Sequence, residues 1–291
     1  MLARNFAPAT RTTRLACALR FLRRIGVSIA EIRRKHVTRY LSLRANELAP
    51  GTSRAELEML KDFLETFVPE VLRENPFTGF RLPKGELKRP PVVLSLNAVR
   101  EFLTQSLRAP RNSKASLSRA IALRNRACLE LLYGVGLRAS ELHAARLVDL
   151  NQEDGTFLVR RAKRGPSRFL PVPKTTLAHL VRYVREGRPH LVAKTKEDPG
   201  HIFLTNRGRP FGKGRVFMIV WKLARTLASK AHPHAFRRTL ATHLVRAGVD
   251  LLALKELLGH VRLSTTERYV ELDREDLRNA VAFLERASRD E

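Results

Sequence analysis

The chain has 291 residues, enough for one large domain or two ordinary ones, and its 55 lysines and arginines far outnumber its 28 aspartates and glutamates. The formal net charge of +27 is spread over the whole length, so we expect a polyanionic partner, namely nucleic acid. The longest run without a charged residue is only ten residues, 90–99. This run is about half the length of a transmembrane helix, which excludes a membrane span and argues against a membrane partner.

The cysteines and histidines indicate neither a metal site nor a disulfide framework. Cys17 and Cys128 each lie within an apolar helical pattern, which fits a reducing, cytoplasmic environment. The histidines towards the carboxyl end have no aspartate or glutamate at ligand spacing, and the glycine motifs that bind nucleotides are absent. We therefore expect no metal, no nucleotide and no other cofactor.

Residues 1–81 are predicted to form an all-helical domain, because apolar residues recur there at three- and four-residue spacing. The stretch PGTSRAE at 50–56 interrupts this pattern. The spacing of Ser53 and Glu56 predicts a capping box at which a new helix begins. A basic cluster in this half predicts a phosphate-contacting face, with an ordinary solvated face as the alternative. The cluster comprises Arg33, Arg34, Lys35 and Arg39.

The prolines and the glycine of RLPKGELKRPP predict an interdomain linker over 82–91, followed by a second domain over 92–291. In this domain Ser95 or Asn97 is expected to cap a helix, and a long helix is expected over 116–132. The runs TFLVRR at 156–161 and RFLPVP at 168–173 predict a β-hairpin, to which 146–151 could add a third strand. The predicted fold is therefore mainly α with two domains, the second of them mixed α+β with a small antiparallel sheet.

The stretch HAFRRTLATHLVRAGVDLLALKELLGH at 234–260 predicts a helical hairpin with polar residues at both ends. His234 and Arg237 share one face of the first helix and can converge on one ligand, while an apolar stripe around Phe236 is predicted to be buried. Asp250 is expected to cap the second helix, and Gly259 to end it in a left-handed conformation. The residue that follows, at 260, is then held close to a helix terminus.

Two further segments supply polar side chains. In YGVGLRASEL, Arg138 follows a Gly-x-Gly bend and precedes a predicted helix. In LSTTERY, a capping-box pattern predicts a helix whose first turns contain Tyr269. Arginines suit phosphate because their planar fork matches its oxygens and keeps its charge. Together with histidines and a hairpin lysine, these residues form a set that can stabilise negative charge on phosphorus without a metal.

At this point the sequence resembles the tyrosine site-specific recombinases, that is, the phage integrases and Xer-type recombinases. The resemblance is carried by five separated motifs, GLRASEL, AKRGPSRFLPVP, PHAFRRTLATHL, LLGH and LSTTERY. They place the family's catalytic roles on Arg138, Lys163, His234, Arg237, His260 and Tyr269. The amino-terminal half resembles the family's helical core-binding (SAM-like) domain, and 92–291 resembles its DNA breaking-rejoining catalytic domain.

The resemblance implies that Tyr269 attacks a scissile DNA phosphate and forms a 3′-phosphotyrosine link without ATP or metal. Lys163 would protonate the leaving 5′-oxygen; Arg164 beside it is a rival, but an arginine is a poor proton donor. Arg164 and Arg168 on the hairpin are also expected to contact DNA. Arg238 stands where the family often has histidine or lysine, and no role is assigned to it.

The implied partner is a double-stranded recombination site bound by a homotetramer on two DNA sites. The segment REDLRNAVAFLERA at 274–287 is predicted to be an amphipathic helix that packs into a neighbouring subunit, with packing on its own domain as the alternative. A partner recombinase is left open, as is the choice among integration, excision and dimer resolution. A type IB topoisomerase-like enzyme and an inactive sequence-specific DNA-binding protein are the alternative functions.

Overall fold

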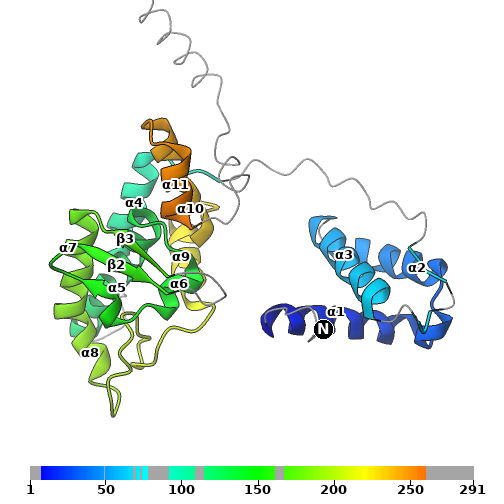
Figure 1. Ribbon diagram of the computed structural model, residues 1–291. Helices are drawn as coiled ribbons and strands as arrows, with labels where there is room; N and C mark the ends of the chain where they lie inside the picture. The colour runs from blue at the N-terminus through cyan, green and yellow to red at the C-terminus, as the bar shows by residue number, and fades with distance from the viewer. Residues whose placement is uncertain are drawn as a thin grey trace, which may run out of the picture. The chain divides into compact units, whose positions relative to one another are not determined.

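The computed structural model describes residues 8–48, 50–67, 70–72, 74–77, 92–108, 115–160 and 167–259. The chain divides into two compact units, Met1–Pro90 and Pro91–Glu291, each of which is described by itself (Figure 1). The expected linker at 82–91 lies outside the described residues. So do four of the predicted site residues, Lys163, Arg164, His260 and Tyr269.

The described part of the amino-terminal unit is helical, as predicted. It contains α1 (Pro8–Ile25), a 3₁₀ turn (Ile29–Glu31), α2 (Arg34–Ala45) and α3 (Pro50–Phe67). Its apolar core includes an edge-to-face pair of Phe21 and Tyr40, whose ring centroids are 5.1 Å apart. The core also contains Cys17, Ile32, Val37, Leu57, Leu60, Leu64 and Phe77.

A new helix does begin in the stretch 50–56, since α2 ends at Ala45 and α3 starts at Pro50, but the predicted capping box is wrong because Ser53 lies within α3. A proline is tolerated in the first turn of a helix, where its missing N–H has no intrahelical partner to lose. The Glu56 carboxylate is buried. It accepts hydrogen bonds from the Tyr40 hydroxyl at 2.8 Å and from Arg44 Nε at 3.0 Å. Glu56 therefore joins α2 to α3 instead of capping a helix.

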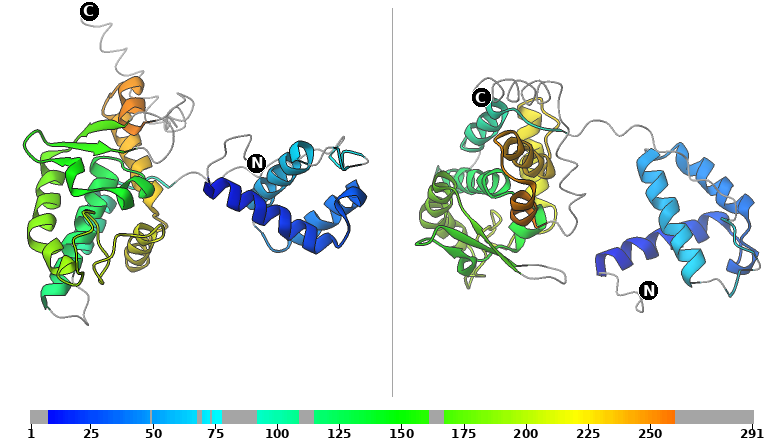
Figure 2. Two further views of the ribbon diagram at one scale, coloured as in Figure 1. Left: turned by 60° about the horizontal axis from the view of Figure 1, so that its bottom comes forward. Right: turned by 45° about the horizontal axis from the view of Figure 1, so that its top comes forward.

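A central helix, α5 (Ala115–Gly134), organises the carboxy-terminal unit. Around it pack α4 (Leu96–Ser106), α7 (Lys174–Arg182), α8 (Arg188–Val192) and α10 (Pro233–Arg246) (Figure 2). The unit is completed by α6 (Ala139–Ala144), α9 (Arg215–Thr226) and α11 (Leu251–Leu258), and a π-helical turn (Tyr183–Gly187) joins α7 to α8. The long helix predicted over 116–132 is thus confirmed. Ser95, not Asn97, caps α4, because its side chain accepts the Ala98 N–H.

The predicted antiparallel sheet is confirmed, with strands shorter than expected. Its order is β1 (Leu150–Asn151), β2 (Thr156–Val159) and β3 (Arg168–Pro171), and Val159 pairs with Arg168 at the end next to the hairpin loop. The third strand does not extend over 146–151 because Leu147–Asp149 forms a 3₁₀ turn. The buried Asp149 carboxylate accepts the Arg146 N–H at 2.9 Å and thereby stabilises this turn.

The predicted helical hairpin at the carboxyl end is formed by α10 and α11. Phe236 is fully buried and packs edge-to-face on Phe102 of α4, which fixes the start of α10 in the core. The Asp250 carboxylate accepts the N–H groups of the first turn of α11, as predicted. Gly259 ends α11 with a φ of 61°, the left-handed conformation that favours glycine. The chain position before His260 is therefore set by a well-defined helix end.

Candidate functional site

Arg237 lies on α10 with its guanidinium in the interior of the unit. The residue is only 1% exposed. Its Nη1 donates to the carbonyl of Gly136 at 2.5 Å, and its Nη2 donates to the carbonyl of Leu258. Gly136 lies in the bend before α6, and Leu258 is the last residue of α11. Arg237 therefore ties together two segments that are 122 positions apart in the chain (258 − 136).

The bend before α6 requires glycine and delivers Arg138 to the same place. Gly136 has a φ of 70°, and a Cβ there would lie 2.8 Å from Leu240 Cδ2. Arg138 then forms the N-cap of α6, and its side chain is 37% exposed. Its Nη2 donates to the carbonyl of Gly259 at 3.2 Å. Arg138 and Arg237 thus meet at the carboxyl end of α11.

Glu141 holds Arg138 in this position. Its carboxylate accepts the Arg138 N–H at 2.9 Å and Arg138 Nη1 at 2.8 Å. Burial raises the pKa of Glu141, but hydrogen bonds from Arg168 and from the Arg138 N–H outweigh burial, so the net pKa lies below its ordinary value. Glu141 is therefore ionised at neutral pH. Sequence reasoning missed its role, although its position three residues after an N-cap is typical of a capping box.

His234 lies beside both arginines on the first turn of α10. Partial burial lowers its pKa, and the positive charges of Arg237, Arg238 and Arg138 lower it further. The ring of His232 stacks near it, with centroids 6.5 Å apart and planes at 11°. The imidazole of His234 is therefore held neutral at pH 7, where it can accept a proton. Arg238 belongs to the electrostatic surroundings of both histidines.

Arg168 was expected to contact DNA, and the structure gives it a protein partner. Its Nη1 and Nη2 donate to the two Glu141 carboxylate oxygens at 3.1 and 3.3 Å, and its side chain is only 14% exposed. Lys163 and Arg164 belong to the loop between β2 and β3, which lies outside the described residues, so their roles remain predictions. The same is true of His260 and Tyr269.

In the amino-terminal unit the predicted basic cluster divides into two kinds of residue. Arg34, Lys35 and Arg39 are exposed on α2. Arg33 is partly buried, donates to the carbonyl of Ala30 at 3.1 Å and pairs with Glu74 at 3.3 Å. Phosphate contact by the exposed three remains a prediction, whereas Arg33 is engaged within its own unit.

A surface that sequence reasoning missed lies on α9, which packs against α6 and α10. Phe217, Met218 and Trp221 are 53%, 47% and 50% exposed, and the Arg225 guanidinium lies over the Trp221 ring at 4.9 Å from its centroid. We call these four residues the α9 face. The signal was present in the sequence RVFMIVWKLART, which carries large apolar residues on both sides of one helix.

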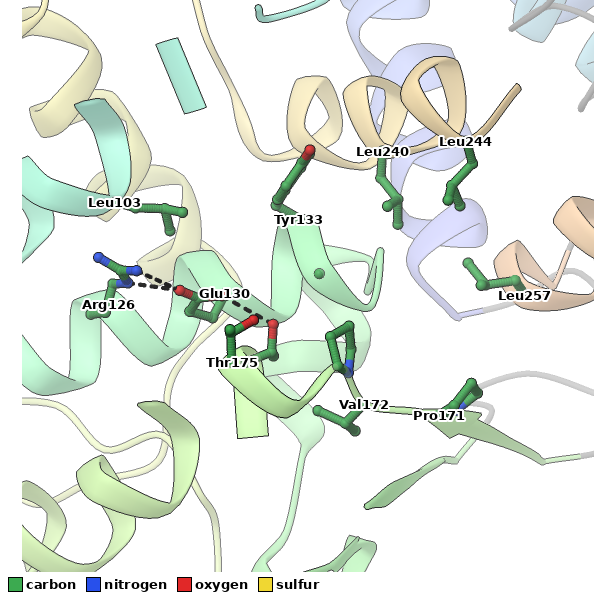
Figure 3. Close-up of a pocket in the computed structure, with 13 residues that line it drawn as sticks. Leu103, Arg126, Glu130, Tyr133, Pro171, Val172, Thr175, Leu240, Leu244 and Leu257 are labelled. Carbon is green, nitrogen blue, oxygen red and sulfur yellow. Dashed lines mark hydrogen bonds and ion pairs between the residues drawn. The ribbon is translucent and has the colours of Figure 1, made fainter. Parts of the chain in front are cut away.

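A pocket of about 560 Å³ lies between α5, the β3–α7 segment, α10 and α11 (Figure 3). Leucines from α4, α10 and α11 line it together with prolines of the β3–α7 segment, so its walls are mostly apolar. Its polar edge is formed by Glu130, which accepts hydrogen bonds from Arg126 Nε at 2.8 Å and from Thr176 Oγ1 at 3.0 Å. Such a pocket suits an amphipathic helix with one charged flank.

Neither a metal centre nor a membrane span is found among the residues that the structure describes. Within these ranges no three histidine, cysteine, aspartate or glutamate side chains are grouped so that they could hold a metal ion. No described helix is both long enough and apolar enough to cross a bilayer.

Comparison with known proteins decides the family. A model of the phage integrase family matches residues 104–276, more than half of the chain. The chain belongs to the phage integrase family. This integrase-family chain is 33% identical over 265 residues to tyrosine recombinase XerC of Oceanobacillus iheyensis, covering 89% of the chain and 83% of that protein. It is 33% identical over 264 residues to XerC of Bacillus subtilis, with the same coverage of 89% and 83%.

Solved structures agree on the fold. The Tn1549 transposon integrase in complex with transposon right end DNA matches with a TM-score of 0.71 at 20% identity, over 96% of this chain and 95% of that chain. A lambda integrase dimer bound to a core site matches with a TM-score of 0.64 at 17% identity, over 92% and 90%. The predicted fold class is thereby confirmed. The chain is a tyrosine recombinase, an enzyme of site-specific recombination, and neither alternative function is favoured.

Proposed function

We propose that this tyrosine recombinase cuts and rejoins the strands of a double-stranded DNA site through a 3′-phosphotyrosine link to Tyr269. One observation carries the proposal. Arg138 and Arg237 come from distant segments, yet both bind the carboxyl end of α11, immediately before His260, which itself precedes Tyr269 by nine positions. Two positive charges held at that point would stabilise the second negative charge that develops on the phosphorus centre when the nucleophile attacks.

In the proposed reaction the Tyr269 oxygen attacks phosphorus, and the bond from phosphorus to the 5′-oxygen breaks. Lys163 gives a proton to that oxygen, which leaves as a hydroxyl. Arg138 and Arg237 neutralise the nonbridging oxygens, and His260 donates a hydrogen bond to one of them. Because the phosphotyrosine keeps the energy of the phosphodiester, a 5′-hydroxyl from another strand reverses the step without ATP.

His234 is the proposed acceptor of the tyrosine proton. An unperturbed tyrosine has a pKa of about 10, so at neutral pH it needs a base and neighbouring positive charge. The lowered pKa of His234 supports this assignment, because a neutral imidazole is available before the attack. The imidazolium that forms afterwards lies among arginines and returns its proton readily.

DNA contacts are proposed for α2 and for the α9 face. Arg34, Lys35 and Arg39 are exposed on α2, where they can bind phosphates without regard to sequence. The α9 face combines exposed Phe217, Met218 and Trp221 with the Arg225 guanidinium. Apolar side chains of this kind contact thymine methyl groups in the major groove, which has the width of a helix. We propose that α9 contributes to the sequence preference of DNA binding and that α2 contributes to its affinity. We also propose that the enzyme acts in the cytoplasm.

We further propose assembly as a homotetramer on two DNA sites. The sequence of 274–287 places Leu277, Val281 and Leu284 at helical spacing with charges between them. The pocket in Figure 3 has apolar walls and a charged edge of matching character. Docking of this segment into the pocket of a neighbouring copy would link the subunits, whereas docking on its own unit would leave a monomer.

The nucleophile assignment is tested with a nicked suicide duplex, from which the short cleaved strand diffuses away and religation is prevented. The wild-type chain should give a covalent protein–DNA band on a denaturing gel. Tyr269→Phe should bind the duplex with unchanged affinity and give no band. A covalent band that persists in Tyr269→Phe, or a wild-type chain that forms none on its selected site, contradicts the proposed function.

A further inference from the structure

A single carboxylate in the site is shared by two arginines from different elements. Glu141 Oε1 accepts Arg138 Nη1 at 2.8 Å and Arg168 Nη1 at 3.1 Å. Glu141 Oε2 accepts the Arg138 N–H at 2.9 Å and Arg168 Nη2 at 3.3 Å. The bond to Arg168 is a bidentate fork, which fixes the orientation of both groups.

The triad of Arg138, Glu141 and Arg168 carries a net formal charge of +1. Arg138 and Arg168 each carry +1 and the ionised Glu141 carries −1, which gives a net +1 for the triad. Without Arg168 the carboxylate would be neutralised by Arg138 alone, and the net charge would be zero. Arg138, which already donates to Glu141 at 2.8 Å, would then compensate the whole carboxylate charge and offer no net positive charge to a phosphate.

Arg168 also contacts the backbone at the end of α11. A Cβ added at Gly259 would lie 2.9 Å from Arg168 Cζ and 2.9 Å from its Nη1. The guanidinium therefore lies directly against Gly259, whose carbonyl accepts Arg138 Nη2. Arg168 meets Glu141 on one side and the residue before His260 on the other.

Arg168 is little accessible to DNA. Its side chain is 14% exposed, and its Nε is buried without a hydrogen-bond partner among the described residues. Both of its η nitrogens are engaged by Glu141. A phosphate contact from this residue would require the fork to open. The geometry instead favours an action on the reaction through Glu141 and Arg138.

We propose that Arg168 is a positioning residue that neutralises Glu141 and so keeps the charge of Arg138 available to the scissile phosphate. This inference rests on the proposed function and deepens it, because the catalytic roles implied by the family motifs do not include Arg168. It replaces the expectation that Arg168 binds DNA directly.

The first test compares Arg168→Gln with the wild-type chain on the nicked suicide duplex. Covalent cleavage should slow by about 10- to 100-fold, because a misplaced catalytic group has effects of this size. DNA affinity and its salt dependence should not change. A direct phosphate contact predicts instead weaker binding and a salt slope lower by about one. That result, or an unchanged cleavage rate, overturns the proposal.

Charge balance provides the second test. In Glu141→Gln combined with Arg168→Gln, the carboxylate that would capture Arg138 is gone, and the net charge of the triad returns to +1. The double variant should therefore cleave faster than Arg168→Gln alone, a coupling that a double-mutant cycle measures. Additive losses in the cycle overturn the proposal.

A matched control is available on the same hairpin. Arg160 lies next to the end of β2, is 54% exposed and pairs through Nε with the buried Asp149 carboxylate at 2.5 Å. Arg160→Gln therefore also removes an arginine from a buried carboxylate, but away from Arg138. It should cleave at the wild-type rate. If Arg160→Gln and Arg168→Gln slow cleavage equally, the effect is general weakening of the hairpin and the proposal fails.

A substrate change keeps the test valid even where Arg168→Gln folds less well. A methylphosphonate at the scissile position replaces one nonbridging oxygen by methyl and removes the negative charge that Arg138 neutralises. The ratio of methylphosphonate to phosphate cleavage is internal to each variant, so the folded fraction cancels. In Arg168→Gln this ratio should rise about 10- to 100-fold over wild type. An unchanged ratio overturns the proposal. Covalent trapping by the wild-type chain separately tests the proposed function on which the role of Arg168 rests.

Discussion

Arg138 and Arg237 bind consecutive carbonyl groups, since Arg138 Nη2 donates to Gly259 and Arg237 Nη2 donates to Leu258. The two arginines nevertheless differ in exposure. The side chain of Arg138 is 37% exposed, while Arg237 as a residue is 1% exposed. The difference predicts that equivalent substitutions at the two positions have different consequences for folding.

Arg237→Lys should reduce both stability and cleavage. A single ammonium group cannot donate to Gly136 and Leu258 in the geometry of the guanidinium, so a buried carbonyl loses its donor. The free energy of unfolding should fall by about 1–3 kcal/mol.

Arg138→Lys should change the free energy of unfolding by less than about 1 kcal/mol, yet reduce the rate of cleavage on the order of 10²-fold. Urea denaturation followed by circular dichroism, combined with the suicide duplex, measures both. Equal destabilisation by the two substitutions would contradict the role of Arg237 as a tie between segments.

His234 predicts a loss of cleavage at acidic pH. Its folded pKa is lowered, mainly by burial and then by the surrounding arginines, so it lies below the unfolded value of about 6.5. Between these two values the unfolded chain binds more protons, and the contribution of His234 to stability falls as the pH falls. Protonation of the imidazole in the folded chain, which occurs at its lowered pKa, removes the base. Cleavage should therefore be constant near neutral pH and decline only as the pH falls through the folded pKa, below the ordinary value of about 6.5.

His234→Gln should cleave slowly and lose this acidic decline. His243, on the same helix, also has a pKa lowered by burial, but its Nδ1 is bonded to the Tyr133 hydroxyl at 2.9 Å, and no hydrogen bond or ring contact joins it to the site in the described structure. His243→Gln should therefore keep the decline. Single-turnover rates between about pH 5.5 and 8.5 distinguish the two. A decline that survives in His234→Gln assigns it to another group.

The division within the basic cluster predicts that substitution of Arg39 weakens DNA binding and that substitution of Arg33 does not. Arg39 is exposed, so Arg39→Gln should weaken DNA binding uniformly across sequences and lower the salt slope by about one. Arg33 pairs with Glu74 and with the Ala30 carbonyl, so Arg33→Gln should leave the slope unchanged. Affinities measured at several salt concentrations test this. A wild-type salt slope in Arg39→Gln would mean that Arg39 does not contact the duplex, and a lowered slope in Arg33→Gln would contradict the division of the cluster.

The α9 face predicts a change in binding without a change in folding. Trp221 is 50% exposed, so Trp221→Ala should leave the unfolding transition in place while it weakens binding to the selected site about tenfold. Binding to random-sequence duplex should change less. Val148, 77% exposed on the 3₁₀ turn, provides the matched control, and Val148→Ala should not affect affinity. If both variants bind the selected site like wild type, α9 does not read the sequence.

Local signals in the sequence predicted local structure well. Asp250 and Gly259 mark the start and end of α11 as expected, because a cap and a left-handed residue depend only on their neighbours. The capping box predicted at Ser53 and Glu56 was wrong because Glu56 makes a long-range contact and not a local one. The Glu56 carboxylate is used by Tyr40, 16 positions away, and no nearest-neighbour pattern encodes that contact.

The site shows the same limit. The convergence of Arg138, His234 and Arg237 was predicted from motifs, whereas the bond of Glu141 to Arg168 spans 27 positions and joins a helix to a strand. A basic residue on a hairpin reads as a DNA contact in sequence, because its exposure is not encoded locally. Only the contacts of Arg168 with Glu141 of α6 and with Gly259 show that its side chain points inward.

The two carbonyls at the end of α11 carry the negative pole of that helix, and Arg138 and Arg237 are the groups that neutralise it. A phosphate that enters the grip competes with the helix end for the same two guanidinium groups. Under the proposed function, a phosphate would therefore replace neutral carbonyl acceptors at these two guanidinium groups. The residue that precedes His260 is thus held by the same guanidinium group that the proposed reaction assigns to the scissile phosphate.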